Sequence, residues 1–121
     1  MSEEINRDVI DQLIELEDGD SSFAAQMINE YFEQLIVKID ELTDLAFARN
    51  YTAVGKLGHY LKGSSACVGA MALADICEEI QNFGSLEPTE ENDTKLLAHL
   101  SHLANKYPML HDQMLAYINK H

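Results

Sequence analysis

One histidine near the middle of the chain is surrounded by residue types that suit phosphate chemistry. His59 lies in the segment GKLGHYLKGSSA, residues 55–66, with Lys56 three positions before it and Lys62 three positions after it. An imidazole is a good nucleophile near neutral pH because the ordinary pKa of histidine is about 6.5. Attack on an aspartyl phosphate would form a phosphohistidine, and the neighbouring lysines could neutralise the charge of the phosphoryl group.

A helix is expected to carry this histidine. On a helical wheel of about 100° per residue, Val54, Leu57 and Leu61 fall on one face of residues 52–68, and His59 falls nearly opposite them. His59 should therefore face solvent. Residues three and four positions away are its neighbours on the helix surface. These neighbours are Gly55, Lys56, Lys62 and Gly63, and Ala66 lies one turn further on.

The glycines of this helix need a reason, because each glycine in a helix interior costs roughly 1 kcal/mol relative to alanine. Gly55 and Gly63 stand four positions before and after His59, where a missing side chain would let a second protein reach the ring. Gly58 lies near the border of the core face and is expected to serve close helix packing. A second interpretation stays open, in which an exposed histidine between two surface lysines has no function.

The charge of the chain restricts the class of partner. The 121 residues carry a net charge of -13 and include eight lysines and arginines. Nucleic acids and anionic membranes bind through a positive field, so neither is expected as a partner. Two of the eight cations lie within three residues of His59. This local enrichment in an acidic chain indicates a site for an anion.

Several features favour an intracellular protein. No apolar run reaches the roughly 18 residues of a membrane span, and the acidic N-terminus lacks the apolar stretch of a secretory signal. Cys67 and Cys77 both fall in predicted helices and are interpreted as small, reduced core residues. We expect a cytoplasmic monomer that is small enough to enter the nucleus passively.

The rest of the chain predicts helices. Apolar residues make up 46% of the sequence and recur in steps of three and four, while prolines number two and glycines six. The period continues through Pro108, which predicts one long helix with a kink. We expect an all-α fold of one domain, 1–121, in which a short helix packs across one end of an up-down-up-down four-helix bundle. The expected helices span about 8–16, 22–49, 52–68, 71–83 and 89–119.

The sequence around the histidine resembles a known family. Residues 59–65, HYLKGSS, match the signature His-x-x-Lys-Gly-Ser-Ser of histidine-containing phosphotransfer (HPt) domains. The resemblance continues through Ala66, Val68 and Gly69. Residues 77–84, CEEIQNFG, are similar to the second motif helix of free-standing fungal-type HPt proteins, and residues 9–23 resemble their N-terminal docking helix and acidic loop. The likeness covers about two-thirds of the chain.

This resemblance implies a four-helix bundle that carries phosphate between receiver domains in a multistep His-Asp phosphorelay. It implies that His59 is phosphorylated on the ring nitrogen farther from the backbone, that Lys62 stabilises the phosphate, and that Gly63 leaves room for it. Gln81 matches a family glutamine that hydrogen-bonds the active histidine. The residues alone favour another interpretation of Gln81, as an exposed polar residue beside Cys77 and Ile80.

The resemblance also implies the partners. They would be the receiver domain of a hybrid histidine kinase and the receiver domain of a downstream response regulator. Mg²⁺ is expected on the partner receiver, with no cofactor or metal held by this chain. The chain would be a phosphocarrier without turnover of its own, and so no independent enzyme. The alternative is an adaptor that docks receiver domains without taking phosphate.

Two further hypotheses concern neighbouring residues. Close fungal relatives carry a basic residue just after Gly84, where this chain has Ser85, and Lys56 could supply the missing cation. An apolar docking patch for receivers could form beside His59, although the same side chains could equally pack the short helix onto the bundle. We expect them to divide between these two roles. The residues of this patch are Val9, Ile10, Leu13, Leu16, Met27 and Ala66.

A metal site is a weaker alternative. His99 and His102 stand three positions apart on the last predicted helix, a spacing that can ligate a metal. No third ligand is evident near them in the sequence. We therefore expect no metal site in this chain.

Overall fold

The structure is a computed structural model that describes residues 4–16 and 21–120, and every regular element in that part of the chain is helical. The expected helix bounds agree with it to within one or two residues, and the all-α class is confirmed. The helices are α1 (Arg7–Glu15), α2 (Ser21–Phe47), α3 (Tyr51–Cys67), α4 (Met71–Asn82), a 3₁₀ turn η1 (Phe83–Ser85) and α5 (Glu90–Asn119).

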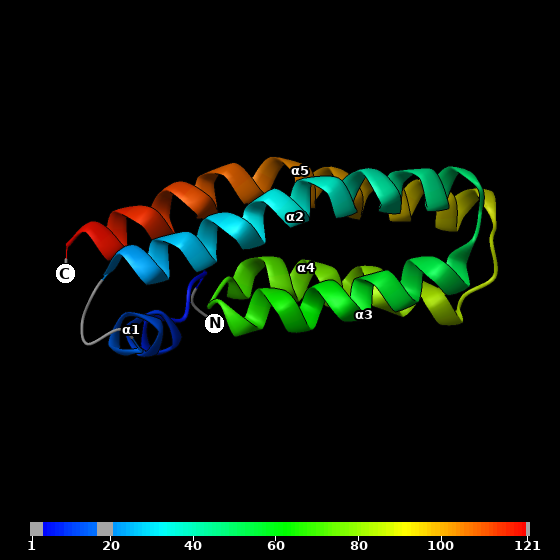
Figure 1. Ribbon diagram of the computed structural model, residues 1–121. Coiled ribbons are helices and arrows are strands. Elements are labelled where there is room, and N and C mark those ends of the chain that lie inside the picture. The colour runs from blue at the N-terminus through cyan, green and yellow to red at the C-terminus, as the bar shows by residue number, and fades with distance from the viewer. Residues whose placement is uncertain (1–3, 17–20, 121) are drawn as a thin grey trace.

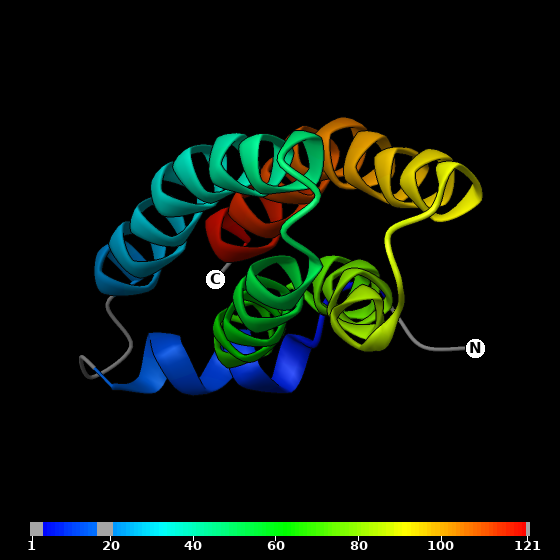
Figure 2. The same ribbon diagram turned by 90° about the vertical axis from the view of Figure 1, so that its right-hand side faces the viewer.

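The four long helices lie side by side along one axis and alternate in direction (Figure 1). Contacts are most extensive between α3 and α4, and then between α2 and α5. Figure 2 shows these two pairs from the end of the bundle, with α1 lying across it. The expected bundle with a short crossing helix is therefore confirmed.

Regular apolar spacing builds the core. On α2 the buried residues form one stripe from Ala24 to Ala46, with steps of three or four apart from the adjacent pair Tyr31 and Phe32. On α5 they recur every three or four positions from Leu96 to Leu103 and every four from Leu110 to Ile118. Pro108 lies inside α5 without ending it, as the continuous period predicted. Behind the histidine helix, the hydroxyls of Tyr31 and Ser65 share a buried hydrogen bond that joins α2 to α3.

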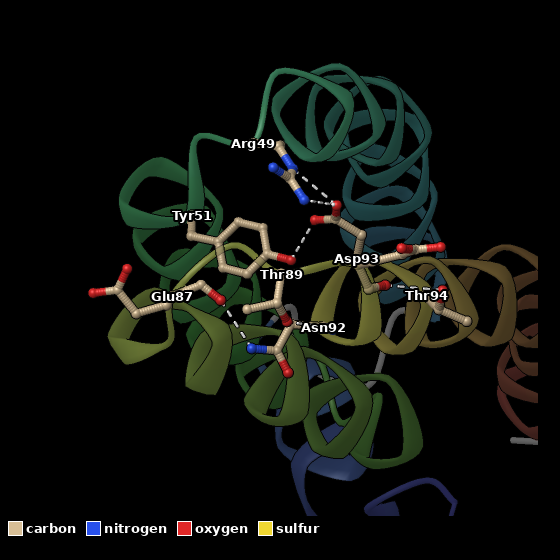
Figure 3. Close-up of polar contacts among 8 residues, drawn as sticks. Arg49, Tyr51, Glu87, Thr89, Asn92, Asp93 and Thr94 are labelled. Carbon is tan, nitrogen blue, oxygen red and sulfur yellow. Dashed lines mark hydrogen bonds and ion pairs between the residues drawn. The ribbon is translucent and has the colours of Figure 1, made fainter.

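The start of α5 is tied to the turn between α2 and α3 (Figure 3). The Thr89 hydroxyl accepts a hydrogen bond from the backbone amide of Asn92 at 3.0 Å and so caps the helix. Asp93 accepts hydrogen bonds from the Tyr51 hydroxyl at 2.6 Å and from Arg49 Nε at 2.8 Å. These two donors, Tyr51 first, hold the pKa of the Asp93 carboxyl below its usual range.

The segment before α1 is pinned to the turn between α3 and α4. Asn6 donates its amide to the Gly69 carbonyl at 2.8 Å, and Ala72 donates to the Glu4 carbonyl at 2.9 Å. Gly69 ends α3 with a φ of 86°, which favours glycine, and a side chain there would stand 2.9 Å from the Asn6 carbonyl oxygen. These contacts fix where α1 crosses the bundle.

The cysteines differ from each other. Cys77 is buried as expected, and burial raises the pKa of its thiol to about 12. Cys67 is exposed, so its interpretation as a core residue is wrong. Cys67 lies on α3 outside the buried stripe that contains Leu61 and Ser65. None of the described helices combines the length and apolar character needed to cross a bilayer.

Candidate functional site

His59 stands in the middle of α3 on its exposed side, as the helical wheel predicted. The opposite side of the same helix is buried at Val54, Gly58 and Leu61. The imidazole is therefore presented to solvent by a helix whose other face is fixed in the core.

Gln81 on α4 reaches across to this ring. Its Oε1 lies 3.4 Å from His59 Nδ1. An amide oxygen only accepts hydrogen bonds, so in this arrangement Nδ1 carries the proton and Nε2 carries the lone pair. The structure thus brings Gln81 to the histidine, in line with the resemblance and against its interpretation as a polar residue without such a contact.

Glycines let α3 and α4 approach closely at this point. A Cβ atom added to Gly58 would stand 2.8 Å from the Gln81 amide nitrogen. One added to Gly55 would stand 2.6 Å from the Gly84 Cα atom. Gly55 therefore serves the packing of α3 against η1, and its part in clearing space around the histidine stays a prediction. Gly55 is buried because η1 packs against α3 at this position, beside the groove that His59 borders.

Gly63 and Ala66 lie toward the other end of the histidine face. Gly63 is exposed, and no atom lies within 4 Å of the position its Cβ would occupy. Ala66 is half-buried. Of the two glycines assigned to keep the ring accessible, only Gly63 stands in open space.

Two lysines flank the histidine on different sides. Lys62 Nζ lies 3.3 Å from Glu78 Oε1 on α4, and both side chains are about half exposed. Lys56 lies with His59 and Ser85 on one shallow groove between α3 and the α4–η1 segment. The remaining residues of this groove are Thr52, Gly55, Gln81, Asn82 and Gly84.

The sequence interpretation gave no role to Glu78 on α4 or to Tyr60, the residue after His59. Glu78 was not assigned a role, because pairing across helices depends on how α3 and α4 are rotated against each other. Tyr60 is 53% exposed and borders a second groove with Val37 on α2. An aromatic residue directly after an outward histidine was the available signal for Tyr60.

The residues expected to dock receivers divide into two groups. Ile10 is completely buried and Leu13 is buried, so both take the alternative left open for them and hold α1 on the core. Leu16 is 67% exposed, while Val9 and Met27 are half-buried. The division follows from α1 being amphipathic, with one stripe on the bundle and one edge in solvent.

The other histidines have neighbours of their own. His111 Nε2 lies 2.7 Å from Asn29 Oδ1, and its ring stacks on Phe32. The His99 ring contacts Phe83 edge to face. Among the described residues, no group of three histidine, cysteine or acidic side chains is placed to hold a metal ion.

Comparison with known proteins identifies the family. The Hpt domain family matches residues 26–113. The chain is 35% identical over 112 residues to multistep phosphorelay regulator 1 of Schizosaccharomyces pombe, covering 85% of this chain and 38% of that protein. It is 36% identical over 102 residues to the phosphorelay intermediate protein YPD1 of Saccharomyces cerevisiae, covering 83% of this chain and 61% of that protein. The chain thus spans less than two thirds of either relative.

Solved structures agree with this assignment. A crystal structure of the yeast phosphorelay protein YPD1 superposes with a TM-score of 0.64 at 32% identity, covering 85% of this chain and 64% of that one. A co-crystal structure of S. cerevisiae Ypd1 with the receiver domain of its downstream response regulator Ssk1 matches in fold, with a TM-score of 0.64 at 24% identity over 98% of this chain and 90% of that one. With most of its length matched by the family and its helices superposed on those of a phosphorelay protein, this chain belongs to the Hpt domain family.

Proposed function

We propose that this protein is a histidine phosphocarrier of a multistep His-Asp phosphorelay. It accepts a phosphoryl group from a receiver-domain aspartate on His59 and passes the group to a second receiver domain. The observation that carries the proposal is the exposed imidazole whose Nδ1 faces Gln81 Oε1 at 3.4 Å. The ring is held at one nitrogen, and the other nitrogen is left to attack.

The transfer balances as a simple displacement. The lone pair of His59 Nε2 attacks the phosphorus of the aspartyl phosphate, an N–P bond forms, the O–P bond breaks, and the aspartate leaves as a carboxylate. The proton on Nδ1 remains between the ring and Gln81. The phosphorylated ring then carries a positive charge, which makes the imidazole a neutral leaving group when the next aspartate attacks. The same geometry therefore serves both directions.

The neighbouring residues have distinct parts in this proposal. Lys62, one turn from His59, stabilises the phosphoryl charge, and Gly63 leaves the space beside the ring open for the partner. Lys56 faces the groove on the opposite side, where Ser85 offers a hydroxyl and no charge. Positioning and charge neutralisation supply most of the catalysis of phosphoryl transfer, so few groups are needed.

The partners follow from the same proposal. Ypd1, to which this chain is 36% identical, has been crystallised with the receiver domain of its response regulator Ssk1. By analogy, this chain docks the receiver of a hybrid histidine kinase and that of a downstream response regulator. The receiver brings the aspartate and Mg²⁺. The chain acts as a monomeric, stoichiometric carrier without independent turnover, in the cytoplasm and with passive access to the nucleus.

Substitution of the histidine separates a carrier from an adaptor. His59→Gln should bind receiver domains as the wild type does, but it should take no label from a radiolabelled, phosphorylated receiver in the presence of Mg²⁺. His102→Gln is the matched control, because it removes another exposed histidine, from α5. Binding by the wild type without transfer from several receivers would instead support the adaptor.

A further inference from the structure

Two contacts join α3 and α4 in the same register. His59 meets Gln81 at 3.4 Å, and three residues further along α3 Lys62 meets Glu78, which stands three residues earlier on α4. The helices are antiparallel, so these pairs lie side by side, about one helical turn apart. The ammonium proposed to stabilise a phosphoryl group on His59 is therefore in an ion pair before any phosphate arrives.

The ion pair changes what Lys62 can offer. Glu78 Oε1 lies 3.3 Å from Lys62 Nζ, so the two unit charges largely cancel for any group further away than their separation. A phosphoryl group on His59 would place a charge of about −1.5 to −2 on its oxygens, offset in part by the positive charge of the phosphorylated ring. It would have to share Lys62 with Glu78, and the Glu78 carboxylate would also repel it.

We propose that Glu78 is a positioning residue that competes with phosphohistidine for Lys62 and so lowers the stability of the phosphorylated state. This inference rests on the proposed function of His59. A carrier must release its phosphoryl group as readily as it accepts it. Glu78 keeps Lys62 beside the site while preventing it from holding the product tightly, which favours onward transfer to the next receiver.

A purely structural part for this ion pair has a different consequence. Both side chains are about half exposed, and such surface pairs contribute little to folding. Removing the Glu78 charge should therefore leave the midpoint of thermal unfolding nearly unchanged. The effect should appear in the distribution of phosphate between the carrier and the receiver, which a structural ion pair would not alter.

The test measures the equilibrium of label between a radiolabelled receiver and the carrier at fixed salt and Mg²⁺. Glu78→Gln should raise the phosphocarrier fraction relative to the phosphoreceiver by about two- to fivefold, the range that an exposed ion pair permits. Glu79→Gln is the matched control, because it removes the charge of the adjacent exposed glutamate on α4. This control should leave the equilibrium within experimental error of the wild type.

A double substitution identifies the route of the effect. In a Lys62→Gln background, Glu78→Gln should change the equilibrium much less than it does in the wild type, because the competed group is gone. An equal effect of Glu78→Gln and Glu79→Gln, a full effect without Lys62, or a fall in phosphocarrier would overturn the inference. Each of those results is compared with wild-type protein that has accepted the label, so none of them contradicts the proposed carrier function of His59. A wild type that takes no label overturns both.

Discussion

The Gln81 backbone lies directly against Gly58: a side chain on Gly58 would stand 2.8 Å from the Gln81 amide nitrogen. This glycine, which weakens α3 as a helix, allows α4 to come close enough for the Gln81 side chain to meet His59. Gly58 thus permits both the close packing of α3 against α4 and the contact between Gln81 and His59.

Gly58→Ala is expected to damage both. The added methyl group must displace α4 backbone, so we expect a loss of about 1–3 kcal/mol in the free energy of unfolding, although alanine is the better helix former by roughly 1 kcal/mol. Urea denaturation measures the loss, and transfer from a phosphorylated receiver should slow as Gln81 is displaced. Gly63→Ala is the control, because its methyl group meets no atom within 4 Å and should stabilise α3. Equal stability of the two variants would contradict the packing argument.

The two groups of α1 residues predict opposite phenotypes. Leu16→Asp places a charge at an exposed position, so it should leave unfolding unchanged while weakening receiver binding. Ile10→Asp buries a carboxylate in the core and should destabilise the bundle by about 3 kcal/mol or more. Thermal unfolding and titration with a receiver domain separate these effects. If Leu16→Asp binds the receiver domain with wild-type affinity, Leu16 is not part of the docking surface.

Lys56 should contribute from the groove side of the histidine. It borders the same groove as His59 and Ser85, where it can supply a cation near the phosphoryl group. Lys56→Ala should slow transfer to the carrier or shorten the phosphohistidine lifetime by about two- to fivefold, as expected for an exposed charge. Lys38→Ala, which removes a lysine of α2, provides the comparison. If the transfer rate and the phosphohistidine lifetime are unchanged in Lys56→Ala, Lys56 does not replace the basic residue that close fungal relatives carry at the position of Ser85.

The hydrogen bonds that Asp93 accepts should make the free energy of unfolding depend on pH under acidic conditions. Its hydrogen bonds from Tyr51 and Arg49 lower the pKa of the folded carboxyl. The stabilisation is therefore complete above the unfolded carboxyl pKa of about 3.9 and is lost as pH falls through the lower folded value. Asp93→Asn should be less stable than the wild type at neutral pH, and the difference should shrink in acid. A pH-independent difference in urea midpoint would rule out this linkage.

The sequence predicted what depends on periodicity within one helix. His59 faces solvent because the apolar residues of α3 occupy the other side, and α5 continues through Pro108 because its apolar spacing does. Relationships between helices were less accessible. The helical wheel predicts that Gly55 and Gly63 both lie exposed beside His59, yet the packing of η1 buries Gly55.

Long-range pairs show the same limit. The pairing of Lys62 with Glu78 depends on the relative rotation of α3 and α4, which periodicity does not specify. Gln81 was placed at the histidine only through the family resemblance, since its residue type alone suggested a surface position. On α1, Ile10 and Leu16 are both apolar, yet Ile10 is buried against the bundle and Leu16 is exposed.

We propose that Nε2 of His59 is the atom that takes the phosphoryl group. The most direct measurement is NMR of the ring nitrogens and the bound phosphorus after the protein, labelled with ¹⁵N at histidine, is phosphorylated by a receiver domain. We predict one phosphoryl group, bonded to Nε2 of His59, acid-labile and base-stable, with the Nδ1 proton still directed at Gln81. A phosphoryl group on Nδ1 or on another residue, or none despite receiver binding, would contradict the account.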